Sequence, residues 1–133
     1  MHIYIPIAAG YSYDQARSFA EILSMMVTQK NPELFTTPRS VASRKKGRVY
    51  FDYLQIGKGK TISAPYVLRA NLDALVATPL DWREVTAKLT PEKFHLRNAL
   101  RRFEKKPDLS GEVLTNKQSL DLALKNLHRL VTD

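Results

Sequence analysis

The segment RVYFDYLQ at residues 48–55 constrains the fold more than any other part of the sequence. It is rich in aromatic and β-branched residues, which favour strands. A period of two places Tyr50, Asp52 and Leu54 on one face of such a strand. Burying a carboxylate is costly unless the group is paired or holds a metal. The segment therefore predicts a strand in which Asp52 is either a metal ligand or a hydrogen-bond acceptor at a sheet edge.

A loop of glycines and lysines follows this strand, with the sequence GKGKT at residues 57–61. A phosphate-binding P-loop needs a glycine five positions before the glycine of Gly-Lys-Thr, and a helix directly after the threonine. Leu54 occupies that position here, and residues 62–65 have an extended pattern. We therefore predict a basic hairpin loop, in which Lys58 and Lys60 either contact phosphate or keep the turn soluble.

Positive charge is concentrated immediately before the Asp52 strand. Five cations lie within ten residues: Arg39, Arg44, Lys45, Lys46 and Arg48. Such a run is either a solvated loop or a contact for a phosphate backbone. The chain as a whole carries a formal net charge of +8, which indicates a polyanionic partner, with nucleic acid ahead of an acidic membrane. A merely basic soluble domain is the alternative.

Composition narrows the class of protein. At 133 residues the chain is long enough for one domain with its own core. The absence of cysteine excludes disulfides and thiolate metal sites, and is compatible with a cytoplasmic protein. No stretch approaches the ~18–20 apolar residues of a membrane helix, so we expect no membrane partner.

The spacing of apolar residues and capping residues predicts the remaining elements. Residues 2–7 alternate as a strand, and residues 61–68 form a second extended segment. Ser12 with Gln15 predicts a capped helix that ends at Asn31-Pro32. Helical signals dominate from residue 80. Helix starts are expected at Asp81 with Glu84, at Thr90-Pro91, and at Thr115 with Gln118. Between the last two starts, apolar residues at helical spacing form one stripe: Leu96, Ala99, Leu100 and Phe103.

These elements predict a single α+β domain over residues 1–133, with a small, mostly antiparallel sheet flanked by helices and a helical C-terminus. Two further residues are candidates for ligand binding. Arg69 is suited either to a bidentate contact with phosphate or to a surface ion pair. His2 shares a strand face with Tyr4 and lies within reach of a ligand on that face.

Several motifs in order resemble the polymerase domain of bacterial DNA ligase D, an archaeo-eukaryotic primase-type enzyme of non-homologous end joining. They are residues 48–55, Gly59-Lys-Thr61, Ala64-Pro-Tyr66 with Arg69, Thr78-Pro-Leu-Asp-Trp82, and the opening His2-Ile-Tyr-Ile-Pro-Ile7. The resemblance is strongest over residues 2–103. It implies a polymerase that adds nucleotides to DNA ends with Mn²⁺ or Mg²⁺.

The resemblance also implies roles for individual residues. Asp52 falls on the metal carboxylate of the third motif, Gln55 and Arg69 on positions that bind the incoming triphosphate, and His2 on the second-motif histidine near the nucleotide. The basic residues Arg44, Lys45, Lys46 and Arg48 fall where the family is basic and close to DNA.

The family's first motif, a pair of aspartates separated by one residue, has no counterpart here. The resemblance therefore implies a C-terminal half of the domain that is inactive alone, because one carboxylate cannot hold two metals. A second polypeptide would then supply the other half. The alternatives are a catalytically dead remnant that binds nucleic acid, and a structural fragment that forms a homodimer through an open sheet edge.

Overall fold

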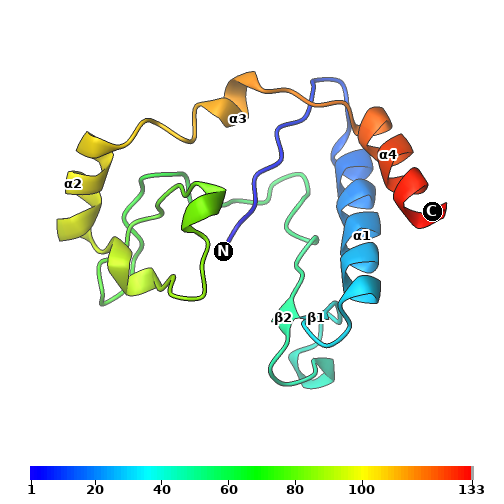
Figure 1. Ribbon diagram of the computed structural model, residues 1–133, viewed down its shortest axis with the longest axis horizontal. Helices are drawn as coiled ribbons and strands as arrows, with labels where there is room; N and C mark the ends of the chain where they lie inside the picture. The colour runs from blue at the N-terminus through cyan, green and yellow to red at the C-terminus, as the bar shows by residue number, and fades with distance from the viewer. Residues whose placement is uncertain (133) are drawn as a thin grey trace. The chain divides into compact units, whose positions relative to one another are not determined.

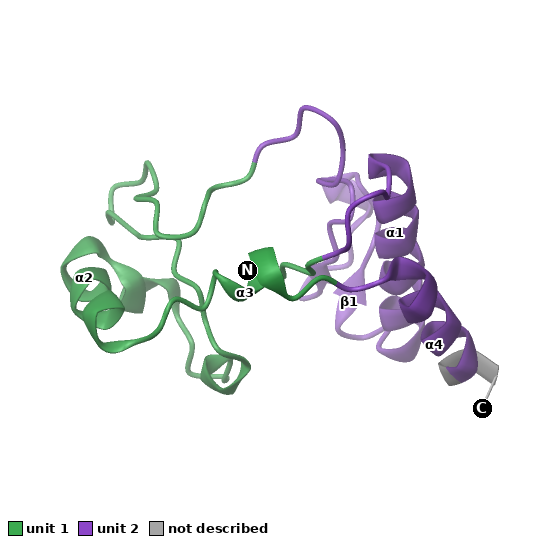
Figure 2. Ribbon diagram, turned by 90° about the horizontal axis from the view of Figure 1, so that it is seen from above, with its two compact units in different colours: residues 1–6, 62–117 green, residues 7–61, 118–133 purple. Residues whose placement is uncertain are grey.

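The computed structural model describes residues 1–132, with the side chains of residues 1–129 (Figure 1). It divides into two compact units, one of residues 1–6 and 62–117 (unit 1) and one of residues 7–61 and 118–133 (unit 2), which are described separately (Figure 2). The prediction of a single domain stays a prediction. The mixture of helices with a small sheet agrees with the broad α+β expectation.

Unit 2 begins with the long helix α1 (Tyr13–Lys30), which starts and ends as predicted. The Ser12 hydroxyl accepts from the Gln15 amide at 3.2 Å, and the Gln15 side chain accepts from the Ser12 amide at 2.8 Å, which completes the capping box. The Asn31 amide donates to the Val27 carbonyl at the other end. Helix α1 contacts β1 and the last helix, α4 (Leu120–Thr132), beside which it lies (Figure 1).

The sheet of unit 2 is parallel, so the prediction of a mostly antiparallel sheet is wrong. Strand β1 (Phe35–Thr36) pairs with β2 (Val49–Tyr50), and the amides of Val49 and Phe51 donate to carbonyls of the facing segment at 2.8 and 3.0 Å. Parallel strands need a crossover connection instead of a tight hairpin. Residues 37–48, which include the short 3₁₀ helix η1 (Val41–Ser43), provide that connection.

The other two predicted strands do not form as regular strands. Residues 2–6 have no strand pairing, and Ile3 and Ile5 are 58% and 47% exposed, so their alternation does not bury an apolar face. Ile7 makes an isolated parallel bridge to Gln118. In the segment 61–68, Leu68 pairs with Val76 in an isolated antiparallel bridge. Periodicity alone predicted these strands, but a strand also needs a neighbouring strand to satisfy its backbone.

Unit 1 is held together by backbone hydrogen bonds among three short segments, residues 66–69, 74–77 and 94–96. Backbone amides of Tyr66, Arg69 and Leu96 donate to carbonyls of residues 77, 75 and 74 at 2.6, 2.7 and 3.0 Å. Leu75 also forms an antiparallel bridge with His95. Val76 lies at the centre of this arrangement and is buried. These antiparallel bridges are isolated and do not form the predicted sheet.

Two of the predicted helix starts in unit 1 are confirmed, although both begin 3₁₀ helices. Asp81 caps η2 (Trp82–Glu84) in a reciprocal pair with Glu84, and Pro91 opens η3 (Pro91–Phe94). Helix α2 (Leu96–Lys105) buries Ala99, but Leu100 is 60% exposed, so the predicted apolar stripe is correct only in part.

The last helix starts later than the sequence predicts. Thr115 is the final residue of the short helix α3 (Glu112–Thr115), and it does not cap α4. Ser119 has that role, because its hydroxyl accepts from the Leu122 amide at 3.3 Å and its carbonyl from the Ala123 amide at 3.1 Å. Within the described residues, no helix is both long enough and apolar enough to span a bilayer.

Candidate functional site

Asp52 lies in a turn immediately after β2. The strand ends at Tyr50, and Asp52 is exposed, so it is not the buried strand carboxylate that the sequence pattern suggested. Its Oδ1 accepts from the Leu54 amide at 3.1 Å, and its Oδ2 accepts from the Gln55 side-chain amide at 3.3 Å. The structure thus brings together two of the predicted site residues, Asp52 and Gln55, on an accessible turn.

Tyr53 anchors this turn to helix α1. Its hydroxyl donates to the Glu21 carboxylate at 2.9 Å, and this hydrogen bond raises the pKa of Tyr53 above its ordinary value. Phe51 contacts Phe35 of β1, with the ring centroids 6.5 Å apart. The residues on either side of Asp52 therefore attach the turn to the body of unit 2, while the Asp52 carboxylate faces solvent.

The donor chemistry of Asp52 suits a hard divalent cation, since Mg²⁺ and Mn²⁺ prefer oxygen ligands. A complete site needs more than one such ligand. Among the residues that the structure describes, no group of three or more histidine, aspartate or glutamate side chains is placed to hold a metal ion. Asp52 fits as one ligand of a divalent metal, and a full coordination shell is not present within the described residues.

The basic segment before β2 contains one arginine with a clear structural role. The Arg44 guanidinium stacks over the Tyr50 ring at 3.6 Å and donates to the carbonyls of Pro38 and Arg39 at 3.0 and 2.9 Å. These contacts fold the connection between β1 and β2. By contrast, the side chains of Lys45, Lys46 and Arg48 form no hydrogen bond or ion pair with described residues, so their charges are available to a ligand.

The glycine–lysine loop is a turn, but it is not the predicted hairpin loop, because no regular strand flanks it on either side. The Lys60 amide donates to the Gly57 carbonyl at 3.2 Å, and Gly59 has a φ of +75°, a conformation that favours glycine. No helix follows Thr61, which agrees with the rejection of a P-loop. Lys58 and Lys60 are exposed on this turn.

The other two predicted site residues belong to unit 1. Arg69 is exposed, its amide donates to the Leu75 carbonyl, and its guanidinium has no partner among the described residues. His2 is also exposed, two residues before Tyr4, whose hydroxyl donates to the Ser63 carbonyl at 3.3 Å. The structure records no contact between His2 and Arg69, and both belong to a different unit from Asp52 and Gln55.

Unit 1 also contains an ion-pair network that the sequence did not suggest. Arg102 binds both oxygens of Glu84, at 2.6 and 2.7 Å, and Lys106 binds the same carboxylate at 2.7 Å. Arg102 also donates to the Pro79 carbonyl at 3.1 Å. These hydrogen bonds, the Arg102 contacts above all, hold the pKa of Glu84 well below its usual range. The capping pattern at Asp81 identified Glu84, but its partners lie 18 and 22 positions further along the chain, beyond any local signal.

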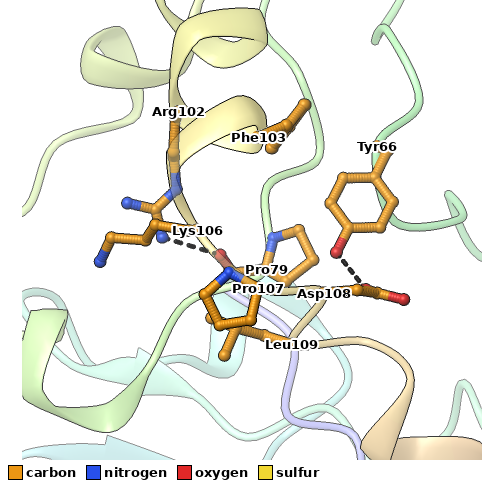
Figure 3. Close-up of a pocket in the computed structure, with 8 residues that line it drawn as sticks. All are labelled: Tyr66, Pro79, Arg102, Phe103, Lys106, Pro107, Asp108 and Leu109. Carbon is orange, nitrogen blue, oxygen red and sulfur yellow. Dashed lines mark hydrogen bonds between the residues drawn. The ribbon is translucent and has the colours of Figure 1, made fainter.

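A cavity of about 260 Å³ lies beside this network, lined by residues that include Tyr66, Pro79, Phe103 and Asp108 (Figure 3). The Tyr66 hydroxyl donates to the Asp108 carboxylate, as the dashed line shows, and the Tyr66 ring meets Phe103 edge-on with centroids 4.8 Å apart. Burial raises the pKa of Tyr66, and the Tyr66 hydrogen bond lowers that of Asp108. Tyr66 has a φ of +68°, which is unfavourable for a non-glycine residue, so these contacts hold a strained backbone.

The family model for the LigD primase-polymerase domain matches residues 1–110. The chain belongs to the LigD primase-polymerase domain family. This confirms the resemblance found in the motifs. The chain is 39% identical over 106 residues to the bifunctional non-homologous end joining protein LigD of Bacillus subtilis, covering 79% of this chain and 17% of the relative.

Two multifunctional LigD proteins are also similar. The protein from Mycolicibacterium smegmatis is 34% identical over 97 residues, which cover 73% of this chain and 12% of the relative. The protein from Pseudomonas aeruginosa is 25% identical over 112 residues, which cover 84% of this chain and 13% of the relative. The chain therefore spans less than a fifth of the length of these LigD relatives.

Proposed function

We propose that this chain forms part of a primase-type polymerase that adds nucleotides to DNA ends during non-homologous end joining. In this proposal Asp52 supplies one carboxylate ligand to a divalent metal, and Gln55, Arg69 and His2 contact the incoming nucleoside triphosphate. The observation that carries the proposal is the exposed turn after β2, where the Asp52 carboxylate accepts from a backbone amide and from Gln55. Membership of the LigD primase-polymerase family supports it.

Asp52 and Gln55 suit these roles because of what surrounds them. No cation pairs with Asp52 among the described residues, so its negative charge is available to an external cation. The Gln55 amide, which donates to Asp52, is positioned to orient the carboxylate or to exchange that bond for a phosphate oxygen. When bound, Mn²⁺ or Mg²⁺ would neutralise phosphate charge and polarise the phosphorus–oxygen bonds.

Arg69 suits a triphosphate because its guanidinium presents paired donors and has no partner among the described residues. Its backbone is fixed by the hydrogen bond from its amide to the Leu75 carbonyl at 2.7 Å. A guanidinium held at a fixed backbone position, with its donors free, is ready to bind an anion without first breaking an ion pair. In the same proposal, His2 makes a second polar contact with the nucleoside triphosphate.

The proposal is tested by calorimetry with Mn²⁺ and a ribonucleoside triphosphate. Asp52→Asn is expected to weaken metal-dependent nucleotide binding by about tenfold or more, because even outer-shell partners of metal sites contribute about 10–100-fold. Asp73→Asn is the matched control, since Asp73 is an exposed aspartate of unit 1. Equal binding by the wild type and by both variants would sink the assignment of Asp52.

A second variant tests the triphosphate contact. Arg69→Gln should weaken nucleotide binding by about 1.5–3 kcal/mol, the usual contribution of a hydrogen bond to a charged group. Arg83→Gln removes the same charge from another exposed arginine of unit 1 and should leave the affinity unchanged. If both variants bind as well as the wild type, Arg69 is an ordinary surface cation.

A second candidate function is DNA binding without nucleotide transfer. The observation that favours it is the lack, within the described residues, of a group of acidic or histidine side chains able to hold a metal. DNA binding that is sensitive to salt, in a chain that binds no nucleotide with Mn²⁺, would select this candidate.

Under the first candidate the remaining metal ligands come from the triphosphate or from a partner polypeptide, and mixing with such a partner would restore activity. A homodimer stays a prediction, which light scattering tests.

A further inference from the structure

Helix α2 presents two faces of different chemistry. Its inner face carries Ala99, which is 1% exposed, together with Phe103 and Arg102, which are half-buried. Its outer face carries Arg97, Arg101 and Lys105, all exposed, which we call the outer stripe. The members of the outer stripe are four residues apart, so they stand one above the other on the same side of the helix.

The cations of the two faces differ in their partners. On the inner side, Arg102 and the following Lys106 both bind Glu84. Within the part of the chain that the structure describes, no member of the outer stripe forms an ion pair or a side-chain hydrogen bond. Lys93 would continue the four-residue spacing, but its ammonium group donates to the Lys88 carbonyl at 2.7 Å, so it is not included.

The outer stripe is unfavourable for the helix itself. Like charges at i and i+4 destabilise a helix by a few tenths of a kcal/mol per pair. Glu104 is the one acidic residue in α2, and it forms no ion pair with described residues. Glu104 lies three residues after Arg101, but a single glutamate cannot balance three cations, so the outer stripe stays positive, which points to an anion from outside.

We propose that the outer stripe of α2 binds the phosphate backbone of duplex DNA, as a surface additional to the basic segment of residues 44–48. The stripe extends over nine residues, from Arg97 to Lys105, which is about 12 Å along the helix. A duplex of that length carries about seven phosphate charges, a density that suits closely spaced cations. A membrane surface fits less well, because a helix that lies on lipid needs its apolar face toward the bilayer, and here Ala99 and Phe103 pack inside unit 1.

This inference rests on the proposed function in naming DNA as the polyanion, but it needs neither metal nor nucleotide. The test compares two triple variants of the full chain, each of which removes three positive charges. One is Arg97→Gln with Arg101→Gln and Lys105→Gln. The control is Arg83→Gln with Lys88→Gln and Lys117→Gln, at exposed cations elsewhere in unit 1. Glutamine has nearly the helix propensity of arginine and lysine, so α2 should persist.

Binding to a fluorescent duplex is measured by anisotropy between about 50 and 200 mM salt, with a chelator present. The slope of log affinity against log salt should fall by about 2–3 in the stripe variant, because each phosphate contact in a duplex contributes about 0.9. The control should keep most of the wild-type slope. The thermal midpoint of the stripe variant should stay the same or rise slightly, since like-charge repulsion is removed.

Three results would overturn the proposal. The first is an equal salt slope for the stripe variant and the control, and the second is a thermal midpoint of the stripe variant so low that unfolding accounts for its lost binding. The third is a stripe variant that no longer binds phosphatidylserine vesicles but still binds DNA like the wild type. Because the assay contains no metal, a failure of the stripe leaves the Asp52 proposal standing. Likewise, if the Asp52 test fails, the salt dependence of DNA binding still tests the outer stripe independently.

Discussion

Glu84 and Asp52 are two carboxylates in very different surroundings. The Glu84 side chain is 23% exposed and receives Arg102, Lys106 and the amide of Asp81. Asp52 is exposed and accepts from a backbone amide and from the neutral side chain of Gln55. The charge of Glu84 is therefore neutralised by neighbours 18 and 22 positions away, whereas the charge of Asp52 has no cationic partner among the described residues.

The difference separates a carboxylate that stabilises the fold from one that is available to a ligand. Glu84 joins η2 to α2 and so determines how unit 1 packs. Removing it leaves a half-buried guanidinium without its partner. Asp52 closes only a local turn, and its charge is free to bind an external cation. Stability measurements should therefore respond to Glu84, and ligand measurements should respond to Asp52.

The largest effect is expected for Glu84→Gln. This change removes the charge that binds Arg102 and Lys106, and should lower the free energy of unfolding by about 2 kcal/mol, within the range for losing charged hydrogen bonds at a partly buried site. Chemical denaturation measures it. The control is Glu104→Gln, which removes an exposed glutamate of α2 and should change little. Equal stabilities for the two variants would show that the network does not contribute to folding.

The pH dependence of that difference follows from the low pKa of Glu84. A carboxyl group whose pKa is depressed in the folded state adds stability above its unfolded pKa, near 4.5, and that stability is lost as the pH falls toward the folded pKa. The stability gap between the wild type and Glu84→Gln should therefore be constant near neutral pH and shrink below about pH 4.5. Denaturation curves at several pH values measure the gap. A gap that widens on acidification would contradict the assignment.

A smaller effect is expected for Tyr66→Phe. This variant keeps the edge-on ring contact with Phe103 and removes only the hydrogen bond to Asp108. The loss should be about 1 kcal/mol, the usual net contribution of one hydrogen bond. Tyr4→Phe provides the control, because the Tyr4 hydroxyl makes a single exposed bond to the Ser63 carbonyl. A larger loss in the control than in Tyr66→Phe would mean that the pocket contact does not hold the strained Tyr66 backbone.

Local features of the fold were predictable from the sequence. The capping pairs Ser12 with Gln15 and Asp81 with Glu84 form as expected, because both partners lie within one helical turn and need no tertiary contact. The turn at residues 57–60 also followed from its glycines. The parallel pairing of β1 with β2 did not follow, because register between distant segments depends on the path of the connection.

The site was predictable in part. The motifs identified the family and placed Asp52 and Gln55 in one segment, and the structure shows them in contact. The pattern also suggested that Asp52 sits within a strand, which is wrong because β2 ends at Tyr50 and the last hydrogen bond to the facing segment comes from the Phe51 amide. The Glu84 network was missed since Arg102 and Lys106 look like ordinary surface cations in the sequence. Only the folding of α2 against η2 shows that they are paired.

The smallest effect on stability is expected for Asp52→Asn. The side-chain oxygen of asparagine accepts the Leu54 amide as well as a carboxylate does, so the turn is kept, and the free energy of unfolding should change by less than about 0.5 kcal/mol. The same variant should lose the rise in thermal midpoint that Mn²⁺ with a triphosphate gives the wild type, because a ligand that binds only the folded state stabilises it. If the free energy of unfolding falls by more than about 1 kcal/mol without ligand, Asp52 stabilises the fold as Glu84 does. The contrast between the two carboxylates would then be wrong.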